Sequence, residues 1–172
     1  SEVICSGDCV LLTATPSEIG GDYLWSTGET TQTIEVCPNT NSVYTVTYTI
    51  NGFTTPASIS TVTVNPTPLV EVNDETICDG ETFNIQPTDN SPTEIVPVGT
   101  TYSWSTPVSN PAGVVTGGAS GTSQASISQT LANASDYPAT LTYTVQPEFN
   151  GCKGDPFEVV ITVNPTVGVD AI

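Results

Sequence analysis

VYTVTYTI, at positions 43–50, is the stretch of sequence that decides the fold. Its tyrosines, Val46 and Ile50 fall on one face of an extended chain, and its threonines fall on the other face. Such alternation with a period of two is typical of an antiparallel strand that buries one face. TLTYTV at 140–145 and FEVVITV at 157–163 alternate in the same way. Short runs of this kind, bounded by Gly, Pro, Asn and Asp, predict an all-β protein made of sandwiches.

The chain carries the same sequence blocks twice, in the same order. Blocks that recur in order indicate two copies of one folding unit, each with its own core. We therefore expect one sandwich over residues 1–66 and a second over 67–166. The matching blocks are ICSGDCVLLTA (4–14) with ICDGETFNIQP (77–87), YLWSTG (23–28) with YSWSTP (102–107), YTINGF (48–53) with a stretched YTVQPEFNGC (143–152), and STVTVNPTP (60–68) with VITVNPTV (160–167).

The two ends of the chain differ from the rest of this alignment. The first copy has no match for NPTPLVEV (65–72), the expected first strand of the second copy, whereas NPTVGVDA (164–171) does match it. We therefore expect domain 1 to lack its own first strand. Residues 167–172 would form a strand for a next repeat or a neighbouring subunit, with Val167 and Val169 pointing into that neighbour's core. A fragment cut at an arbitrary point from a continuous array of repeats would show the same pattern of matching and missing blocks.

The charge of the chain excludes several classes of function. The 172 residues carry a formal net charge of -17, with a single Lys, no Arg and no His. Nucleic-acid backbones and anionic membranes attract clusters of basic residues, so neither is an expected partner. There is no apolar run of transmembrane length. Without His or a Ser-centred motif, the usual nucleophile arrangements are missing, and we expect no enzyme activity.

Both copies resemble repeats of large secreted surface proteins of Bacteroidota. The first, ICSGDCVLLTA…YLWSTGETTQTIEV…YTVTYTINGF, resembles the Ig-like type. The second, ICDGETFNI…YSWS…LAN…LTYTVQPEFNGCKGDPFEVVITVNP, resembles the PKD-like type. The resemblance covers nearly the whole chain and implies two tandem immunoglobulin-like (PKD-like) β-sandwich domains from adhesive or spacer arrays, similar to gliding-motility adhesins. By analogy with the immunoglobulin strand order, Trp25 and Trp104 would be buried between the sheets.

The five cysteines indicate an oxidising, extracellular compartment. In the immunoglobulin-like strand order, Cys9 begins one strand and Cys37 ends its antiparallel neighbour, so we expect these two to form a disulfide. The second copy contains two cysteines, Cys78 and Cys152, and this even number favours a bond between them. Geometry favours Cys5, because Cys78 lies at the far end of the domain, and five residues of strand span about 17 Å. One cysteine is left over, which indicates pairing between molecules.

Two kinds of binding site need to be weighed. Glu71, Asp74 and Glu75 lie at the domain junction, where carboxylates would be able to hold Ca²⁺, although a solvated linker is the commoner reading of such a run. The Trp and Tyr rings would be able to stack on sugars, although rings on alternating strands more often pack in a core.

The sequence therefore predicts an extracellular structural or adhesive repeat of a cell-surface array or filament, with copies of itself or neighbouring repeats as partners. Head-to-tail strand donation is the assembly that the chain ends favour. A carbohydrate-binding module with surface glycans as partners is the alternative. Beyond Ca²⁺, no cofactor is expected.

Overall fold

A computed structural model describes residues 1–71 and 74–166 of the chain. Strands, turns and loops make up this part, and no helix in it is long and apolar enough to cross a membrane. The chain divides into two compact units, Ser1–Pro66 and Thr67–Ile172, which we call unit 1 and unit 2. The all-β sandwich fold predicted from the alternation of apolar and polar residues is confirmed.

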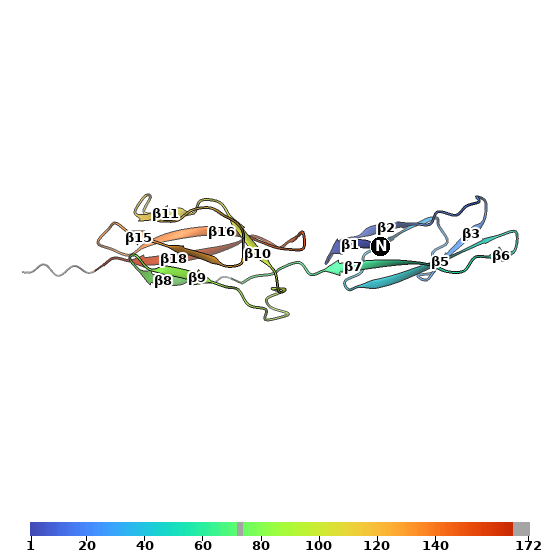
Figure 1. Cartoon of the computed structure of the whole chain (residues 1–172), viewed down its shortest axis with the longest axis horizontal. Coiled ribbons are helices and arrows are strands. Elements are labelled where there is room, and N and C mark those ends of the chain that lie inside the picture. Colours follow the sequence, from blue (N-terminus) through green and yellow to red (C-terminus); the bar gives the residue numbers. More distant parts are fainter. Residues whose placement is uncertain (72–73, 167–172) are drawn as a thin grey trace, which may run out of the picture. The chain divides into compact units, whose positions relative to one another are not determined.

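Unit 1 is a sandwich of two sheets (Figure 1). Its strands are β1 (Glu2–Cys5), β2 (Val10–Thr13), β3 (Asp22–Trp25), β4 (Thr33–Val36), β5 (Ser42–Ile50), β6 (Phe53–Thr54) and β7 (Ser58–Asn65). One sheet has the order β1-β7-β5-β3, with β6 paired to β5, and the other sheet consists of β2 and β4.

Unit 2 repeats this arrangement with additional short strands (Figure 1). Its strands are β8 (Glu75–Cys78), β9 (Thr82–Ile85), β10 (Thr101–Trp104), β11 (Val108–Asn110), β12 (Val115–Thr116), β13 (Gly121–Gln124), β14 (Ile127–Thr130), β15 (Ala132–Asn133), β16 (Ala139–Phe149), β17 (Cys152–Lys153) and β18 (Phe157–Asn164). The larger sheet has the order β13-β10-β16-β18-β8, with β11 and β17 paired to β16. β9 pairs with β14, and β12 pairs with β15.

The last hairpin of each unit has the same register. Val46 lies opposite Ser58 in unit 1, and Val145 lies opposite Phe157 in unit 2, with equal numbers of residues between the partners. Both hairpins turn through Asn-Gly, with φ of 52° and 80° in unit 1 and 47° and 85° in unit 2. Two residues with positive φ match the twist of the flanking strands. The hairpins therefore align without a gap, and the stretching assumed from the sequence is wrong.

Each unit begins with a short strand, β1 or β8, that the alternation of residues did not predict. The expected lack of a unit 1 counterpart of residues 65–72 stays a prediction. β1 pairs in parallel with β7, with Ile4 opposite Val64. β8 pairs in parallel with β18 in the same way, with Ile77 opposite Val163. The edge of β7 is therefore covered over Val62–Asn65.

The stretch at 65–72 had been expected to form the first strand of the second copy. Beyond the end of β7, its described residues form only an isolated bridge, between Leu69 and Ile95. Pro66 and Pro68 lack the N–H donors that a regular ladder requires, which explains why alternation alone was misleading here.

The stretch 123–131 contributes to two different sheets. β13 pairs with β10, whereas β14 pairs with β9. The chain passes from one sheet to the other at Ala125 and Ser126, between these strands. Alternation does not reveal such a change, because both sheets bury alternate residues.

Each unit has a core between its sheets, and both tryptophans belong to these cores. Trp25 is 4% exposed and Trp104 is 6% exposed, which confirms that both are buried. Their indole N–H groups donate to the carbonyl oxygens of Thr31 and Ala119, each at 2.8 Å. The core of unit 1 is much smaller than that of unit 2: its fully buried members are Leu12, Trp25, Ile34, Val36 and Val62.

Candidate functional site

A disulfide between Cys9 and Cys37 joins the ends of β2 and β4, with Cα atoms 4.1 Å apart. Unit 2 has Thr82 and Thr130 at the same positions of its corresponding strand pair. These threonines lie directly opposite each other, and their hydroxyl oxygens are 2.6 Å apart. A hydrogen bond in unit 2 therefore stands where unit 1 has a covalent bond.

The remaining cysteines occupy distinct places in the fold. Cys78 carries a free, exposed thiol, so it is not the partner of Cys152. Cys78 lies in β8 opposite Asn164, at the C-terminal end of β18. Cys152 lies in β17 opposite Phe149, at the C-terminal end of β16, which is at the opposite end of the sheet because β16 and β18 are antiparallel. Cys152 is 2% exposed, and neither it nor Cys5 is a free thiol. A bond between Cys5 and Cys152 stays a prediction.

Glu71, Asp74 and Glu75, the candidate Ca²⁺ ligands, make hydrogen bonds or belong to a strand in the structure. An oxygen of Asp74 accepts a hydrogen bond from the Val160 N–H at 2.9 Å, and Glu75 belongs to β8. The backbone N–H of Glu71 donates to the Glu94 carboxylate at 3.3 Å. Within residues 1–71 and 74–166, no three acidic, Cys or His side chains gather as a metal site would require.

The C-terminal strand expected to bind a neighbour, with Val167 and Val169, lies outside the described residues. The preceding Thr166 is described, and its hydroxyl donates to Asp79 at 2.7 Å. This bond, with a second one from the Asn133 N–H, holds the pKa of Asp79 below its ordinary value. The chain is therefore fixed to unit 2 up to Thr166.

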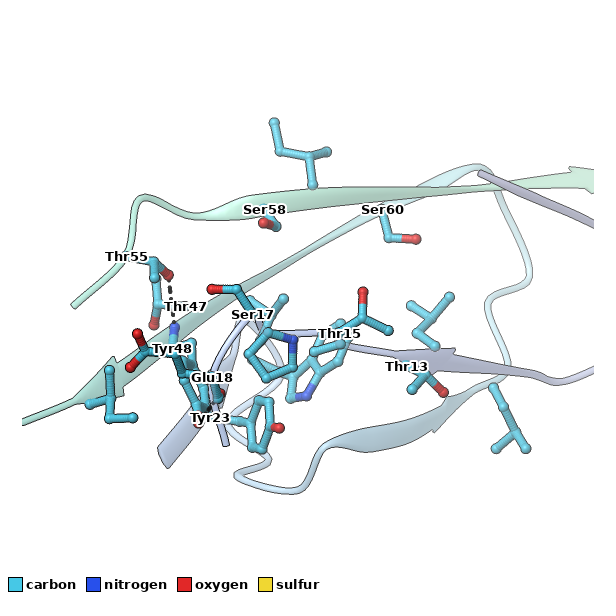
Figure 2. Close-up of a pocket in the computed structure, with 18 of the residues that line it drawn as sticks. Thr13, Thr15, Ser17, Glu18, Tyr23, Thr47, Tyr48, Thr55, Ser58 and Ser60 are labelled. Carbon is cyan, nitrogen blue, oxygen red and sulfur yellow. Dashed lines mark hydrogen bonds between the residues drawn. The ribbon is translucent and has the colours of Figure 1, made fainter. Parts of the chain in front are cut away.

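A groove opens between the two sheets of unit 1, along β2 and the first half of β7 (Figure 2). Its volume is about 710 Å³. The buried side is formed by the rings of Trp25 and Tyr48. The remaining lining mixes hydroxyl groups with apolar residues and the carboxylates of Glu2 and Glu18. The hydroxyl groups include those of Thr13, Thr15, Ser17, Thr47, Thr55, Ser58 and Ser60, and the apolar residues are Leu11, Leu12, Ala14, Pro16, Val46, Ile50 and Ile59.

The groove is open because β7 presents small side chains to it. Figure 2 shows Ser58 and Ser60 on β7, directed toward this space. Phe157 and Val159 occupy the same positions in unit 2, where they are 7% and 0% exposed. The Phe157 ring packs edge-on against Tyr102, with centroids 6.3 Å apart. In unit 2, apolar side chains therefore fill the space that is open to solvent in unit 1.

A loop at the rim of this groove presents an exposed isoleucine. Residues 16–19 read PSEI, and Ile19 is 92% exposed. The loop is nevertheless held in place, because the Tyr48 hydroxyl donates to the Glu18 carbonyl at 2.9 Å and accepts the Gly21 N–H at 2.7 Å. A large apolar side chain on a fixed loop is presented to solvent without a partner in the described residues.

Unit 2 carries the matching loop, PTEI at 92–95, and there the isoleucine has a partner. The backbone N–H of Ile95 donates to the Leu69 carbonyl at 2.8 Å, and the Ile95 carbonyl accepts the Leu69 N–H at 2.9 Å. On either side of Leu69, Pro68 is almost fully buried and Val70 is 8% exposed within the core cluster of unit 2. The segment Thr67–Glu71 thus packs on this loop and contributes to the core.

Two buried tyrosines of unit 2 have perturbed acidity. Burial, with a smaller contribution from the charge of Glu94, raises the pKa of Tyr102 to about 12. Burial alone raises the pKa of Tyr143. Both rings pack against aromatic neighbours in the core, so these shifts reflect desolvation and not a reactive site.

Sequence reasoning missed the groove and the exposed Ile19. Two signals were present: PSEI recurs as PTEI, and an ungapped alignment places Ser58 and Ser60 against Phe157 and Val159. The gapped alignment adopted for the hairpin concealed the second signal.

Comparison with known proteins finds a family match for unit 2. The family model described as "PKD-like domain" matches residues 75–167, which is more than half of the chain. No curated protein sequence matches the chain.

Several solved structures resemble the fold at low identity. The insect immune protein hemolin has 14% identity over 94% of this chain and 44% of its own, with a TM-score of 0.42. The IG1+IG2 portion of DIP-gamma has 8% identity over 95% and 93%, with a TM-score of 0.44. The D00-D0 domain of intimin has 13% identity over 93% and 94%, with a TM-score of 0.38. This chain thus spans less than half of hemolin.

The family match covers β8 to β18, the strands that form the larger core and bury Trp104. With the tandem sandwiches described above, this match identifies the chain as a member of the PKD-like domain family.

Proposed function

We propose that the chain is an extracellular structural or adhesive module that works as a repeat in a cell-surface array or filament. Its partners are neighbouring repeats or copies of itself, and its parent is a surface adhesin of the Bacteroidota type. The observation that carries this proposal is the duplication itself. Both units share their strand order, the Asn-Gly hairpin and a buried tryptophan, all of which serve the fold. Tandem copies of a sandwich extend a surface protein without adding chemistry.

The acidic surface agrees with a role outside the cell. With a formal net charge of -17, copies repel one another unless specific contacts bring them together, which keeps the chain soluble until it assembles. The Cys9–Cys37 disulfide requires an oxidising compartment to persist. We therefore propose a non-enzymatic, extracellular role.

Glycan binding, the alternative function, finds little support in the aromatic side chains. Trp25, Trp104, Tyr48 and Tyr102 are each at most 7% exposed, so these rings are not available to stack on sugar rings. The exposed rings are those of Phe53, 80% exposed, and Tyr137, 51% exposed. A glycan array tests this alternative directly. A defined sugar bound with micromolar affinity would favour the carbohydrate-binding module.

Labelling of intact cells tests the proposed function. Antibodies raised against the recombinant chain should decorate the surface of the source cells, and electron microscopy should locate the label on surface arrays or filaments. Label confined to the cell interior would contradict the proposal.

A further inference from the structure

The larger sheet of unit 1 carries exposed apolar side chains on three neighbouring strands. Leu24 of β3, Val43 of β5 and Ile59 of β7 are 56%, 62% and 71% exposed. Ile59 lies between Ser58 and Ser60, which point into the groove (Figure 2), so its side chain points to the opposite, outer face of the sheet. Val43 and Ile59 are diagonal neighbours on paired strands, which places them about 7–8 Å apart.

The positions around these side chains carry no charge. On the described strands β5 and β7, every other outward position between residues 43 and 63 is a threonine: Thr45, Thr47, Thr49, Thr61 and Thr63. The formal net charge of the chain is -17, so an uncharged face of this extent stands apart from the composition of the whole.

Unit 2 has polar or charged residues at the matching positions of its own sheet. The strand registers give these counterparts: Ser103 for Leu24, Thr142 for Val43, and Glu158 for Ile59. The fold therefore does not require apolar side chains at these positions. Exposed apolar side chains that gather without serving the fold indicate a contact surface.

The charge of the chain indicates which partner fits this face. A basic partner would gain no ion pairs from an uncharged surface, and it would bind the acidic surface elsewhere. A second copy is as acidic as the first, so two copies pack closely only where neither presents charge. The outer face of the β1-β7-β5-β3 sheet meets this condition, and two sheet faces pack against each other at a spacing of about 10 Å.

The size of the face determines the strength of the contact. Four strands, over the run from Val43 to Thr49, measure about 20 Å by about 20 Å, or roughly 400 Å² per partner. Stable complexes bury about 800 Å² per partner, so one such contact is weak. Units tethered in an array meet at effective concentrations of about a millimolar, where a weak contact is populated.

We propose that the outer face of the β1-β7-β5-β3 sheet binds the same face of a second copy, around Val43 and Ile59. This inference rests on the proposed role as an array repeat. Because the same surface is used on both copies, a two-fold axis relates them and the contact closes as a dimer. Between arrays, this contact joins two of them side by side.

Sedimentation and NMR of the full chain test the proposal. The dimer should form reversibly, with a dissociation constant of about a millimolar, since the interface is half the standard size. Amides of Leu24, Val43–Thr49 and Ser58–Thr63 should shift as the concentration rises. Added salt should strengthen the association, because it screens the repulsion between two acidic copies.

The residues of unit 2 supply matched variants. Ile59→Glu copies Glu158, which the same position of a β-sandwich accepts in unit 2. The variant should weaken the dimer at least tenfold, because a carboxylate enters the interface from both copies and loses water. Val108→Glu is the control, since Val108 of β11 in unit 2 is 70% exposed and receives the same charge. We expect the control to associate like the unaltered chain, and thermal unfolding checks that both variants are folded.

Four results would overturn the inference. The chain stays monomeric up to about 2 mM, twice the expected dissociation constant; the shifts fall outside the face; the Ile59→Glu variant associates as well as the Val108→Glu variant; or assembly continues beyond a dimer. A monomeric chain whose binding to the source cells is lost with Ile59→Glu would show that the face takes a different partner. Cell labelling is independent of these results, so failure of the dimer can be told apart from failure of the surface role.

Discussion

Removal of the Cys9–Cys37 disulfide should destabilise unit 1 selectively. The bond spans 28 residues of sequence, and closing a loop of that length in the unfolded chain is worth about 3.5 kcal/mol in the chain-entropy model. A domain of this size has a total stability of roughly 3–10 kcal/mol. Because the fully buried core of unit 1 is small, the double variant Cys9→Ser, Cys37→Ser should lose much of its folded population.

Hydrogen exchange measured by mass spectrometry gives the result separately for each unit. In the double variant, amides of β2 and β4 should exchange a few hundredfold faster, corresponding to about 3.5 kcal/mol. In calorimetry, the transition of unit 1 should fall by roughly 15–25 °C. The amides of β9 and β14 should exchange as before.

The matched control lies at the equivalent site of unit 2. Thr82→Val with Thr130→Val removes the hydrogen bond between the two hydroxyls while keeping the shape of the side chains. We expect a loss of about 1 kcal/mol or less, because the pair is exposed. If the cysteine variant lost no more than this control, the disulfide would not be what stabilises the small core.

The other predictions concern unit 2. Trp104→Ala should lower its unfolding free energy by about 3–5 kcal/mol in urea titrations, as for other large core truncations; unchanged stability would contradict the structural role. Gly121→Ala should cost about 1–3 kcal/mol, because its methyl group would meet the Trp104 ring, and the same titration checks it. Asn133 is 7% exposed and donates at 2.8 Å to the carbonyls of Tyr137 and Val163, so Asn133→Ala should cost about 1–3 kcal/mol by leaving buried groups unpaired. Burial raises the pKa of Tyr102 to about 12. The unfolded chain releases this proton near pH 10, so stability should fall as the pH rises from about 10 to 12; a flat stability profile alongside tyrosinate absorbance would refute this.

The strands and buried tryptophans could be predicted from the sequence because their signals are local. Alternation in VYTVTYTI and FEVVITV requires only neighbouring residues, and Trp25 and Trp104 lie on runs of the same kind. The first strand was misassigned because EVIC (2–5) is too short to alternate clearly, whereas PLVEV (68–72) alternates but follows prolines.

The groove could not be predicted, because it depends on which residues face each other across strands. Ser58 and Ser60 are ordinary residues for a strand, and only their register with the β5 residues shows that they replace Phe157 and Val159. The exposure of Ile19 likewise depends on the absence of a packing partner, which is a property of tertiary structure.

The pairing of β17 with β16 has a consequence for digestion by proteases. Lys153 is the only basic residue of the chain, so it is the only position after which a trypsin-like protease cleaves. Lys153 lies in β17, where it pairs with Glu148 of β16. Its neighbour in sequence, Cys152, is 2% exposed. A protease binds its substrate in an extended form, so the hairpin must first open, and that opening draws on the stability of unit 2. A protein built in this way withstands trypsin-like enzymes for as long as this hairpin stays folded.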